Sequence, residues 1–246
     1  MTKDLVVEKK SQNEIVHDDS IALKVENLSK IYNSAAGRVV ALDNVSFSIK
    51  KGDFVSIIGP SGSGKSTVLN MVGALDRPTS GKIYIDGIDI FSLNDSDLAT
   101  MRNRRIGFIF QSFNLINRTT VQKNVKLPGI IAGISSDEAD SRAIKILEAL
   151  GIADKRNQKP VNLSGGQQQR VAIARSLINN PSIILADEPT GNLDTKTGED
   201  VFDMLKMLSH KFKRTIIMVT HNPELAESTD RSILLRDGRI EKDVVN

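Results

Sequence analysis

The segment Gly59-Pro-Ser-Gly-Ser-Gly-Lys-Ser-Thr67 decides the fold of this chain of 246 residues. It lies between residues 54–58, an apolar run typical of a strand, and residues 65–75, whose apolar side chains recur at helical spacing. It matches G-x-x-x-x-G-K-[ST], in which glycines let backbone N–H groups surround phosphates at the positive end of a helix. We predict that Lys65 reaches the β- and γ-phosphates and that Ser66 binds Mg²⁺. The predicted nucleotide-binding residues of this loop are Gly59, Pro60, Ser61, Gly62, Ser63, Gly64, Lys65, Ser66 and Thr67.

A glycine-rich turn without a ligand is the alternative for this loop, and an acidic element farther along the chain argues against it. Residues 183–186 read Ile-Ile-Leu-Ala, and Asp187 and Glu188 follow. Such an apolar run is typical of a strand in a parallel sheet, where ligands bind at the carboxyl ends of the strands. We expect this strand next to the phosphate-loop strand, with Asp187 holding Mg²⁺ and Glu188 as the general base for an attacking water. The alternative for Glu188 is a solvated acid at a strand end.

A third element, Ser164, Gly165, Gly166 and Gln167, stands at the start of a helix predicted over residues 167–179. Free N–H groups and a hydroxyl make this helix start suited to an anion, but it contains no lysine. It could recognise a phosphate group. However, it cannot easily contact the same phosphate that Lys65 binds within one subunit. A plain helix cap is the alternative.

The rest of the chain alternates predicted strands with predicted helices. Strands are indicated at residues 21–25, 45–49 and 215–219, helices at 136–150 and 195–212, and a hairpin with an Asp-Gly turn at 233–240. This alternation favours an α/β fold with a largely parallel sheet and antiparallel pieces at the N- and C-terminal ends. We expect a polar, loosely ordered tail over residues 1–20 and one domain over residues 21–246.

Composition excludes several classes of protein. The chain has no cysteine, which excludes disulfides and cysteine-ligated metals and disfavours redox chemistry. A net charge of +3 and an aromatic content of 4%, without a basic stripe, give no reason to expect a nucleic-acid partner. No apolar run approaches the length of about 20 residues that crosses a bilayer, and the N-terminus lacks the apolar stretch of a secretory signal. We therefore expect a cytoplasmic location.

Residues 21–240 resemble the nucleotide-binding subunit of an ABC transporter, because short motifs occur in that family's order. These are the Walker A loop at 59–67, the signature at 163–167 and the Walker B strand at 183–188. Smaller matches are Tyr32, Gln111 in the Q-loop, the D-loop at 192–194 and the switch histidine His221. The resemblance implies a P-loop core with a mostly parallel sheet, an N-terminal antiparallel β subdomain and an inserted helical subdomain at about residues 112–175.

The amino-acid sequence around these motifs resembles one subgroup of that family. Residues 70–81, 106–115 and 186–194 are similar to the lipoprotein-release, macrolide-export and cell-division group of ABC ATPases. Residues 116–119, Ile-Asn-Arg-Thr, depart from the apolar pair that this group commonly shows. The resemblance therefore implies export or extrusion of a lipoprotein, peptide or drug, with the cargo left open.

The resemblance also implies a mechanism and two partners. Two copies would bind head to tail around two MgATP, each held between one copy's Walker A loop and residues 164–167 of the other. Glu188 would polarise the attacking water, His221 would contact the γ-phosphate, Gln111 would serve the nucleotide and the Mg²⁺, and Tyr32 would stack on adenine. A separate membrane permease would dock near residues 111–127 and keep the chain on the inner face of the cell membrane.

Three other functions share parts of this pattern. An ATP-driven regulator of a membrane protein that controls cell-wall enzymes would contain the same ATPase. A DNA-associated ABC ATPase usually carries a long coiled coil between Lys65 and Leu163, where this chain has only about a hundred residues. A small-molecule kinase or GTPase would leave the element at residues 164–167 without a role.

Overall fold

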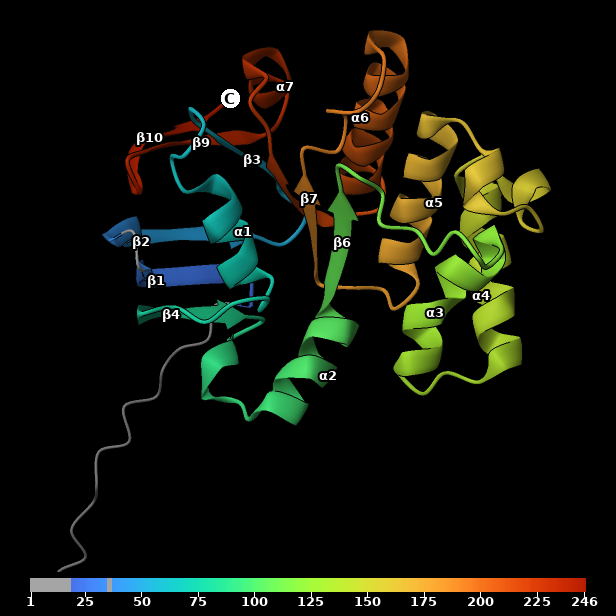
Figure 1. Ribbon diagram of the computed structural model, residues 1–246, viewed down its shortest axis with the longest axis horizontal. Coiled ribbons are helices and arrows are strands. Elements are labelled where there is room, and N and C mark those ends of the chain that lie inside the picture. The colour runs from blue at the N-terminus through green and yellow to red at the C-terminus, as the bar shows by residue number, and fades with distance from the viewer. Residues whose placement is uncertain (1–18, 35–36) are drawn as a thin grey trace, which may run out of the picture.

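Two β-sheets form the frame of the molecule (Figure 1). The computed structural model describes residues 19–34 and 37–246, so the tail predicted at 1–20 falls almost entirely outside the described residues. One sheet is antiparallel, with the order β2-β1-β4-β5, and the other has the order β10-β9-β3-β8-β7-β6. In the second sheet β9 and β10 pair antiparallel, and the remaining described pairs are parallel. The strands are β1 (Ile21–Ser34), β2 (Gly37–Lys50), β3 (Phe54–Ile58), β4 (Ser80–Ile85), β5 (Ile88–Asp89), β6 (Ile106–Phe110), β7 (Ile183–Asp187), β8 (Thr215–Val219), β9 (Arg231–Arg236) and β10 (Arg239–Val245).

The helices divide between the parallel sheet and a group beside it. In Figure 1, α3, α4 and α5 lie together on the side of the molecule opposite to the antiparallel sheet. The α-helices are α1 (Lys65–Val72), α2 (Asp95–Arg105), α3 (Val121–Ile131), α4 (Ser136–Ala149), α5 (Gly165–Leu177), α6 (Thr195–His210) and α7 (Pro223–Glu227). Short 3₁₀ turns occur at Ile90–Ser92, Ala153–Lys155 and Pro160–Asn162. The antiparallel N-terminal sheet, the parallel core and the terminal hairpin confirm the predicted fold class.

The predicted neighbour of the phosphate-loop strand was wrong. β8 lies between β3 and β7 and pairs with both, so the strand that ends in Asp187 is one strand farther away than expected. All five residues of β8 are buried, which suits a strand with a partner on each side. Strand order depends on how the crossover helices pack, and local sequence patterns do not encode it.

The boundaries of three helices also differ from the predictions by two or three residues. α1 ends at Val72 instead of residue 75, because Gly73 packs against the Phe108 ring and Ala74 takes a left-handed φ of 51°. α5 begins at Gly165, two residues early, and ends at Leu177. α6 ends at His210, two residues early.

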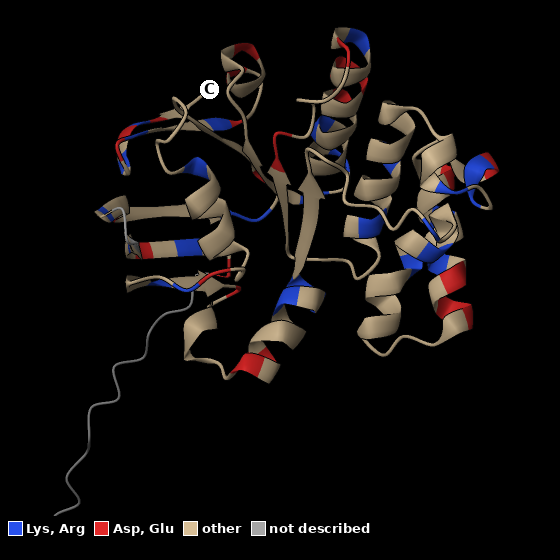
Figure 2. Cartoon of the chain, in the orientation of Figure 1, with Lys and Arg blue, Asp and Glu red and all other residues tan. Residues whose placement is uncertain are grey.

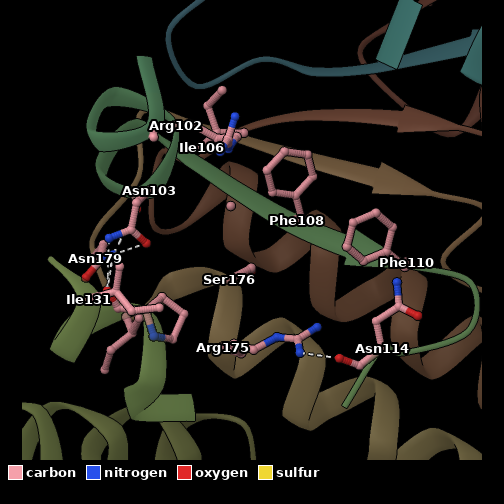
Figure 3. Close-up of a pocket in the computed structure, with 14 residues that line it drawn as sticks. Arg102, Asn103, Ile106, Phe108, Phe110, Asn114, Ile131, Arg175, Ser176 and Asn179 are labelled. Carbon is pink, nitrogen blue, oxygen red and sulfur yellow. Dashed lines mark hydrogen bonds between the residues drawn. The ribbon is translucent and has the colours of Figure 1, made fainter. Parts of the chain in front are cut away.

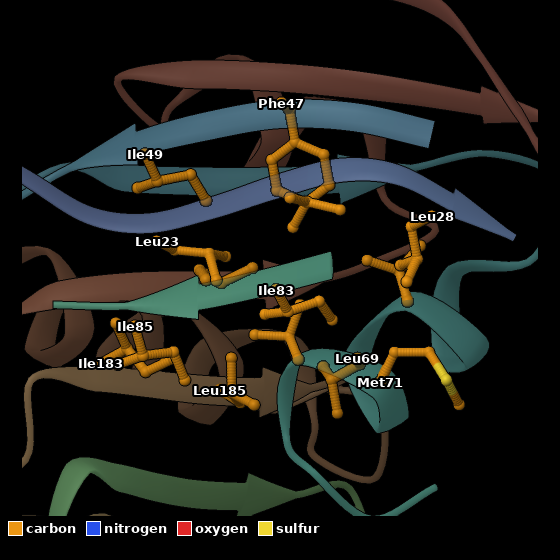
Figure 4. Packing of buried hydrophobic residues seen from close by; sticks show 14 of the residues in the cluster. Leu23, Leu28, Phe47, Ile49, Leu69, Met71, Ile83, Ile85, Ile183 and Leu185 are labelled. Carbon is orange, nitrogen blue, oxygen red and sulfur yellow. The ribbon is translucent and has the colours of Figure 1, made fainter. Parts of the chain in front are cut away.

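Buried apolar side chains form two clusters, one on each side of the parallel sheet. Figure 4 shows the first, in which side chains of the antiparallel sheet such as Leu23 and Ile83 face Leu69 of α1 and Leu185 of β7. The second cluster joins the other side of the parallel sheet to α3, α4, α5 and α6. Figure 2 shows the consequence for charge: β6 and most of β7 are uncharged, and an acidic segment follows β7 at its carboxyl end. The two clusters fix β3 and β7 firmly beneath the loops that carry the predicted site.

Candidate functional site

The predicted phosphate loop joins β3 to α1, as the sequence requires. Gly64 precedes the helix with φ 102°, and no side chain caps the first N–H groups of α1. A Cβ atom on Gly64 would lie 2.5 Å from the Ala41 carbonyl oxygen, and one on Gly59 would lie 2.1 Å from that of Leu235. Glycine is therefore needed at both positions, because neighbouring backbone closes on the loop from outside. The uncapped helix start remains available to an anion.

Two polar side chains of this loop differ in their hydrogen bonding. The Lys65 ammonium donates hydrogen bonds to the carbonyl oxygens of Gly59 at 2.8 Å and Pro60 at 2.9 Å, so its charge lies over the loop itself. The Ser63 side chain is buried, and its Oγ has no hydrogen-bond partner. A polar atom buried without a partner is costly in a protein interior, and a ligand in the loop could satisfy it.

A cavity of about 420 Å³ opens in front of this loop. It brings the loop together with Glu188, which follows β7, and with His221, which follows β8. Tyr32, Gln111 and residues 164–167 are not among its lining residues. The lining consists of Val39, Val40, Ala41, Ser61, Gly62, Gly64, Lys65, Ser66, Thr67, Glu188, Val219 and His221.

Glu188 and His221 form a pair at the edge of the cavity. The His221 Nδ1 lies 2.8 Å and 2.9 Å from the two carboxylate oxygens of Glu188. Glu188 has a left-handed φ of 47°, unusual for a residue other than glycine, and its N–H donates to the Val219 carbonyl oxygen at 3.0 Å. This conformation turns the carboxylate away from the direction of the strand and toward His221. Backbone strain of this kind is frequent at functional sites.

Asp187, the last residue of β7, is half-buried and is not among the residues that line this cavity. Burial first, and then the charge of Glu188, raise the pKa of the Asp187 carboxyl, while Lys65 lowers it. No group of three or more His, Asp or Glu side chains in residues 19–34 and 37–246 is arranged to hold a metal ion. A cation at this site would therefore bind few protein ligands and would take the rest from phosphate oxygens, as Mg²⁺ commonly does.

Gln111 lies beside the predicted D-loop. Its Nε2 donates to the Asn192 Oδ1 at 3.2 Å, and the Asn192 Nδ2 donates back to the Gln111 carbonyl oxygen at 3.1 Å. Gly191 is needed there, since a Cβ atom would lie 2.7 Å from the Gln111 Nε2. The two loops that follow β6 and β7 are therefore coupled within one chain.

Ser164, Gly166 and Gln167 line a second cavity, of about 490 Å³. The Ser164 Oγ accepts from the Gln167 N–H at 3.4 Å, and the Gln167 Oε1 accepts from the Ser164 N–H at 3.0 Å, which makes a capping box. This second cavity shares no lining residue with the first. Its lining consists of Gly151, Ile152, Asp154, Lys155, Ser164, Gly166, Gln167, Arg170 and Thr197.

Sequence reasoning missed two groups of residues near these sites. Gln169 is fully buried in α5, and its Nε2 donates to the Pro189 carbonyl oxygen at 2.6 Å, directly after Glu188. Asp76 accepts a hydrogen bond from the Tyr32 hydroxyl at 3.0 Å and pairs with Lys30. No local pattern marks Gln169, because its partner is 20 residues away in the chain. Asp76 lies in the segment 70–81, which we had used only for its family resemblance.

A groove of about 460 Å³ lies on another part of the surface, between α2 and β6 on one side and α3 and α5 on the other (Figure 3). Phe108 and Phe110 point into it from β6, and Ile131 enters from α3 with 67% of its surface exposed. Arg175 closes one end, donating to the carbonyl oxygens of Phe113 at 2.8 Å and of Asn114. Burial lowers the pKa of this guanidinium, which makes it a fixed, partly desolvated donor.

Comparisons with known proteins agree with this arrangement. A family model described as ABC transporter matches residues 42–191. An uncharacterised ABC transporter ATP-binding protein of Thermotoga maritima is 50% identical over 219 residues, covering 89% of this chain and 93% of the relative. The macrolide export ATP-binding/permease protein MacB of Brucella melitensis is 47% identical over 90% of this chain, which spans only 34% of that protein.

A relative with a solved structure gives the same result. The protein MJ0796 of Methanocaldococcus jannaschii is described as a bacterial ABC transporter cassette, and its dimeric structure matches with a TM-score of 0.83 at 48% identity. The match covers 91% of this chain and 98% of that chain. A second MJ0796 structure, a dimeric post-hydrolysis state bound to ADP and Pi, matches with a TM-score of 0.82 at 47% identity.

No helix in the described part of the chain is both long enough and apolar enough to cross a bilayer.

The comparisons show that the phosphate loop, the acidic end of β7 and the capped helix start at Ser164 belong to a known architecture. The chain is a member of the ABC transporter family, an ATP-binding protein with the ABC ATPase fold and the function of an ATPase.

Proposed function

We propose that two copies of this chain bind head to tail around two ATP molecules. One observation carries the proposal: the phosphate-loop cavity and the cavity at Ser164 share no lining residue, so one copy presents two separate halves of a site. Residues 164–167 offer N–H groups but no lysine, which suits the far side of a triphosphate already bound at Lys65. The structures described for MJ0796 are dimeric, which supports a dimer of this chain as well.

In this proposal the residues around the first cavity have separate roles in the binding and hydrolysis of ATP. The phosphate-loop N–H groups and Lys65 hold the triphosphate, and the Glu188 carboxylate accepts a proton from the attacking water. His221, held by Glu188, contacts the γ-phosphate. Ser66 and Asp187 hold the Mg²⁺, which supplies charge neutralisation on the phosphates when bound. Gln111 can bind the Mg²⁺ together with Ser66 and Asp187 only after the hydrogen bond between its side-chain amide and Asn192 has broken.

The substitution Glu188→Gln tests the base and the dimer together. The amide keeps the size of the side chain but cannot take up the proton, so we expect ATP turnover to fall by about 100-fold or more while ATP binding stays. Size-exclusion chromatography with ATP should then show an accumulated dimer. Glu148→Gln on the exposed face of α4 is the matched control and should leave both measurements unchanged. Turnover at the wild-type rate in Glu188→Gln would refute the assignment of the base.

We further propose that the permease docks in the groove beside α3 and that the chain is thereby held on the inner face of the cell membrane. MacB supports this, because its name describes an ATP-binding region and a permease in one protein, of which this chain spans about a third. The groove is apolar, half-open and close to the predicted contact region at 111–127. We propose the helices grouped over residues 112–175 as the inserted subdomain that moves with the permease, and export as the direction of transport.

A charge in the groove tests the docking proposal. Ile131→Glu places a carboxylate where an apolar partner would desolvate it, so we expect the chain to lose copurification with its permease. Val245→Glu, at another strongly exposed apolar position, on β10, is the control and should keep the partner. Circular dichroism would check that both variants are folded. Full copurification of Ile131→Glu would exclude the groove as the docking site.

A further inference from the structure

Tyr32 on β1 is held by two residues that lie outside the first cavity. Its hydroxyl donates to the Asp76 Oδ2 at 3.0 Å, across a separation of 44 residues in the chain. The Lys30 ammonium lies 2.9 Å from the Asp76 Oδ1 and 2.8 Å from the Oδ2, and 4.8 Å from the centroid of the Tyr32 ring. One carboxylate thus fixes the edge of the ring, and one cation covers a face of it.

The cation in this clamp of Lys30 and Asp76 is more enclosed than the ring it covers. The Lys30 side chain is 12% exposed, and its ammonium also donates to the Arg77 carbonyl oxygen at 2.6 Å. Tyr32 is 39% exposed. Because Lys30 covers one face of the ring, only the opposite face, here called the free face, is left for stacking, and Tyr32 keeps exposed surface for such a contact.

The register of the antiparallel sheet places this ring beside the phosphate loop. Tyr32 lies directly opposite Val39 on β2, and Val39 lines the cavity with Lys65 and Ser66. Directly opposite residues of an antiparallel pair have Cβ atoms about 4.5–5.5 Å apart on one face of the sheet. A base attached to a triphosphate in the loop can therefore reach the free face of the ring.

We propose that Asp76 and Lys30 are positioning residues for nucleotide binding: they lock the Tyr32 ring in one orientation, and Lys30 blocks one face so that the purine base stacks on the other. The inference rests on the proposed function, which places ATP in this cavity. A locked ring loses no side-chain freedom when the base binds. The cation also draws electron density from the ring, which strengthens its stacking on an electron-rich purine.

The electrostatics of the clamp agree with a charged Asp76. Burial raises the pKa of the Asp76 carboxyl, but the hydrogen bonds from Lys30, the Arg77 N–H and Tyr32 outweigh burial and bring the pKa below its usual value. For the Tyr32 phenol, burial first and then Asp76 raise the pKa, so the hydroxyl remains a donor at neutral pH. The clamp is therefore intact under the conditions in which ATP binds.

The same sheet contains a matched control. Lys24 lies directly opposite Tyr84, with its ammonium 6.0 Å from the Tyr84 ring centroid, and it pairs with Glu26 at 2.6 Å. A lysine, a tyrosine and a carboxylate meet here as in the clamp, but neither Lys24 nor Tyr84 lies opposite a residue that lines the first cavity. Substitution of Lys24 thus removes a lysine that lies over a tyrosine, but it does not affect the Tyr32 ring on which the base is proposed to stack.

The test compares the binding of MgATP with that of magnesium tripolyphosphate, which has no base. In Lys30→Met and in Asp76→Asn we expect the affinity for MgATP to fall by about 10-fold, since part of the stacking of the base on the ring is lost. The affinity for tripolyphosphate should stay within about 2-fold. Lys30→Arg keeps a cation over the ring and should restore MgATP binding, and Lys24→Met should change neither affinity.

The outcomes separate this inference from the function on which it rests. An equal loss of MgATP and tripolyphosphate affinity in Lys30→Met would overturn the clamp as a device for the base, because the phosphate loop itself would then be damaged. Unchanged MgATP affinity in Lys30→Met would overturn it as well. A wild-type chain that binds neither ligand would overturn the proposed function. If Asp76→Asn does not fold, Lys30→Met alone decides, with thermal denaturation showing that it is folded.

Discussion

At the scale of single residues, the site depends on backbone conformations that the surrounding structure imposes. Glu188 is held with a left-handed φ of 47°, and Gly59 and Gly64 have no room for a side chain. Gly166 is a further case, since a Cβ atom there would lie 2.3 Å from the Thr197 Cγ2. Helix α5 therefore meets the start of α6 at a distance that only glycine permits, directly beside the capping box of Ser164.

Gly166→Ala should destabilise the chain, because the new methyl group and the Thr197 methyl cannot occupy the same space. We expect a loss of about 1–3 kcal/mol in the free energy of unfolding, measured by urea denaturation. Thr197→Ser removes the methyl group in question, so the double variant should recover most of this loss, and Thr197→Ser alone should be nearly neutral. Equal stability of Gly166→Ala and the wild type would show that the contact is not tight.

At the scale of elements, capping and turn chemistry fixed most boundaries. Asn222 caps α7 ahead of Pro223, and Asp237 and Gly238 form the turn between β9 and β10 with φ values of 48° and 76°. The turn with Asp and Gly is the one predicted from the sequence, and the structure confirms it. Polar contacts add to the apolar packing between α3 and α4: the Asp140 carboxylate on α4 accepts from Lys126 at 2.8 Å and from Gln122 at 2.7 Å, both on α3.

Asp140→Asn should weaken the contact between α3 and α4 in a pH-dependent way. The hydrogen bond from Lys126, opposed by burial and aided by Gln122, brings the pKa of Asp140 below its usual value. A carboxyl with a lowered pKa in the folded state stabilises the fold above the unfolded-state pKa, and this stabilisation is lost as the pH falls through the folded-state pKa.

We therefore expect Asp140→Asn to cost about 0.5–1 kcal/mol of unfolding free energy at pH 7, and the difference from the wild type to shrink below about pH 4. Denaturant titrations at both pH values measure this. Asp203→Asn on the exposed face of α6 is the matched control and should show no such trend. A difference that stays constant with pH would contradict the role of the Asp140 charge.

At the scale of the whole molecule, the two cavities belong to different parts of the chain. The phosphate loop lies over the parallel sheet, and Ser164 starts a helix that packs with α3 and α4. If each complete site draws one half from each copy, two chains that are defective in different halves can make one complete site between them. This is a property of the assembled molecule, and no single residue carries it.

Mixing two inactive variants tests this property. Lys65→Met removes the phosphate-binding cation, and Ser164→Asp keeps a good helix cap while adding a negative charge that repels phosphate. We expect each variant alone to hydrolyse ATP slowly and an equimolar mixture to be clearly more active than either, measured by phosphate release. Ser164→Asn caps the helix without the charge and is the matched control. A mixture no more active than its components would contradict a shared site.

The sequence by itself determined the fold class and named the candidate members of the site. The pattern at residues 59–67 requires a strand before it and a helix after it, and Asp187 and Glu188 follow a buried run, so local chemistry was sufficient to propose them. The possible helix cap at Ser164 was also a local signal, and the structure contains this cap.

Only the tertiary structure decided how these pieces are arranged. It placed β8 between β3 and β7, ended α1 at Gly73 against Phe108, bonded Gln111 to Asn192, and brought Asp76 to Tyr32. Each of these features joins residues that are far apart in the chain and depends on packing and hydrogen bonds formed after folding. Periodicity and motifs report only on neighbours within a few turns, and therefore could not have revealed them.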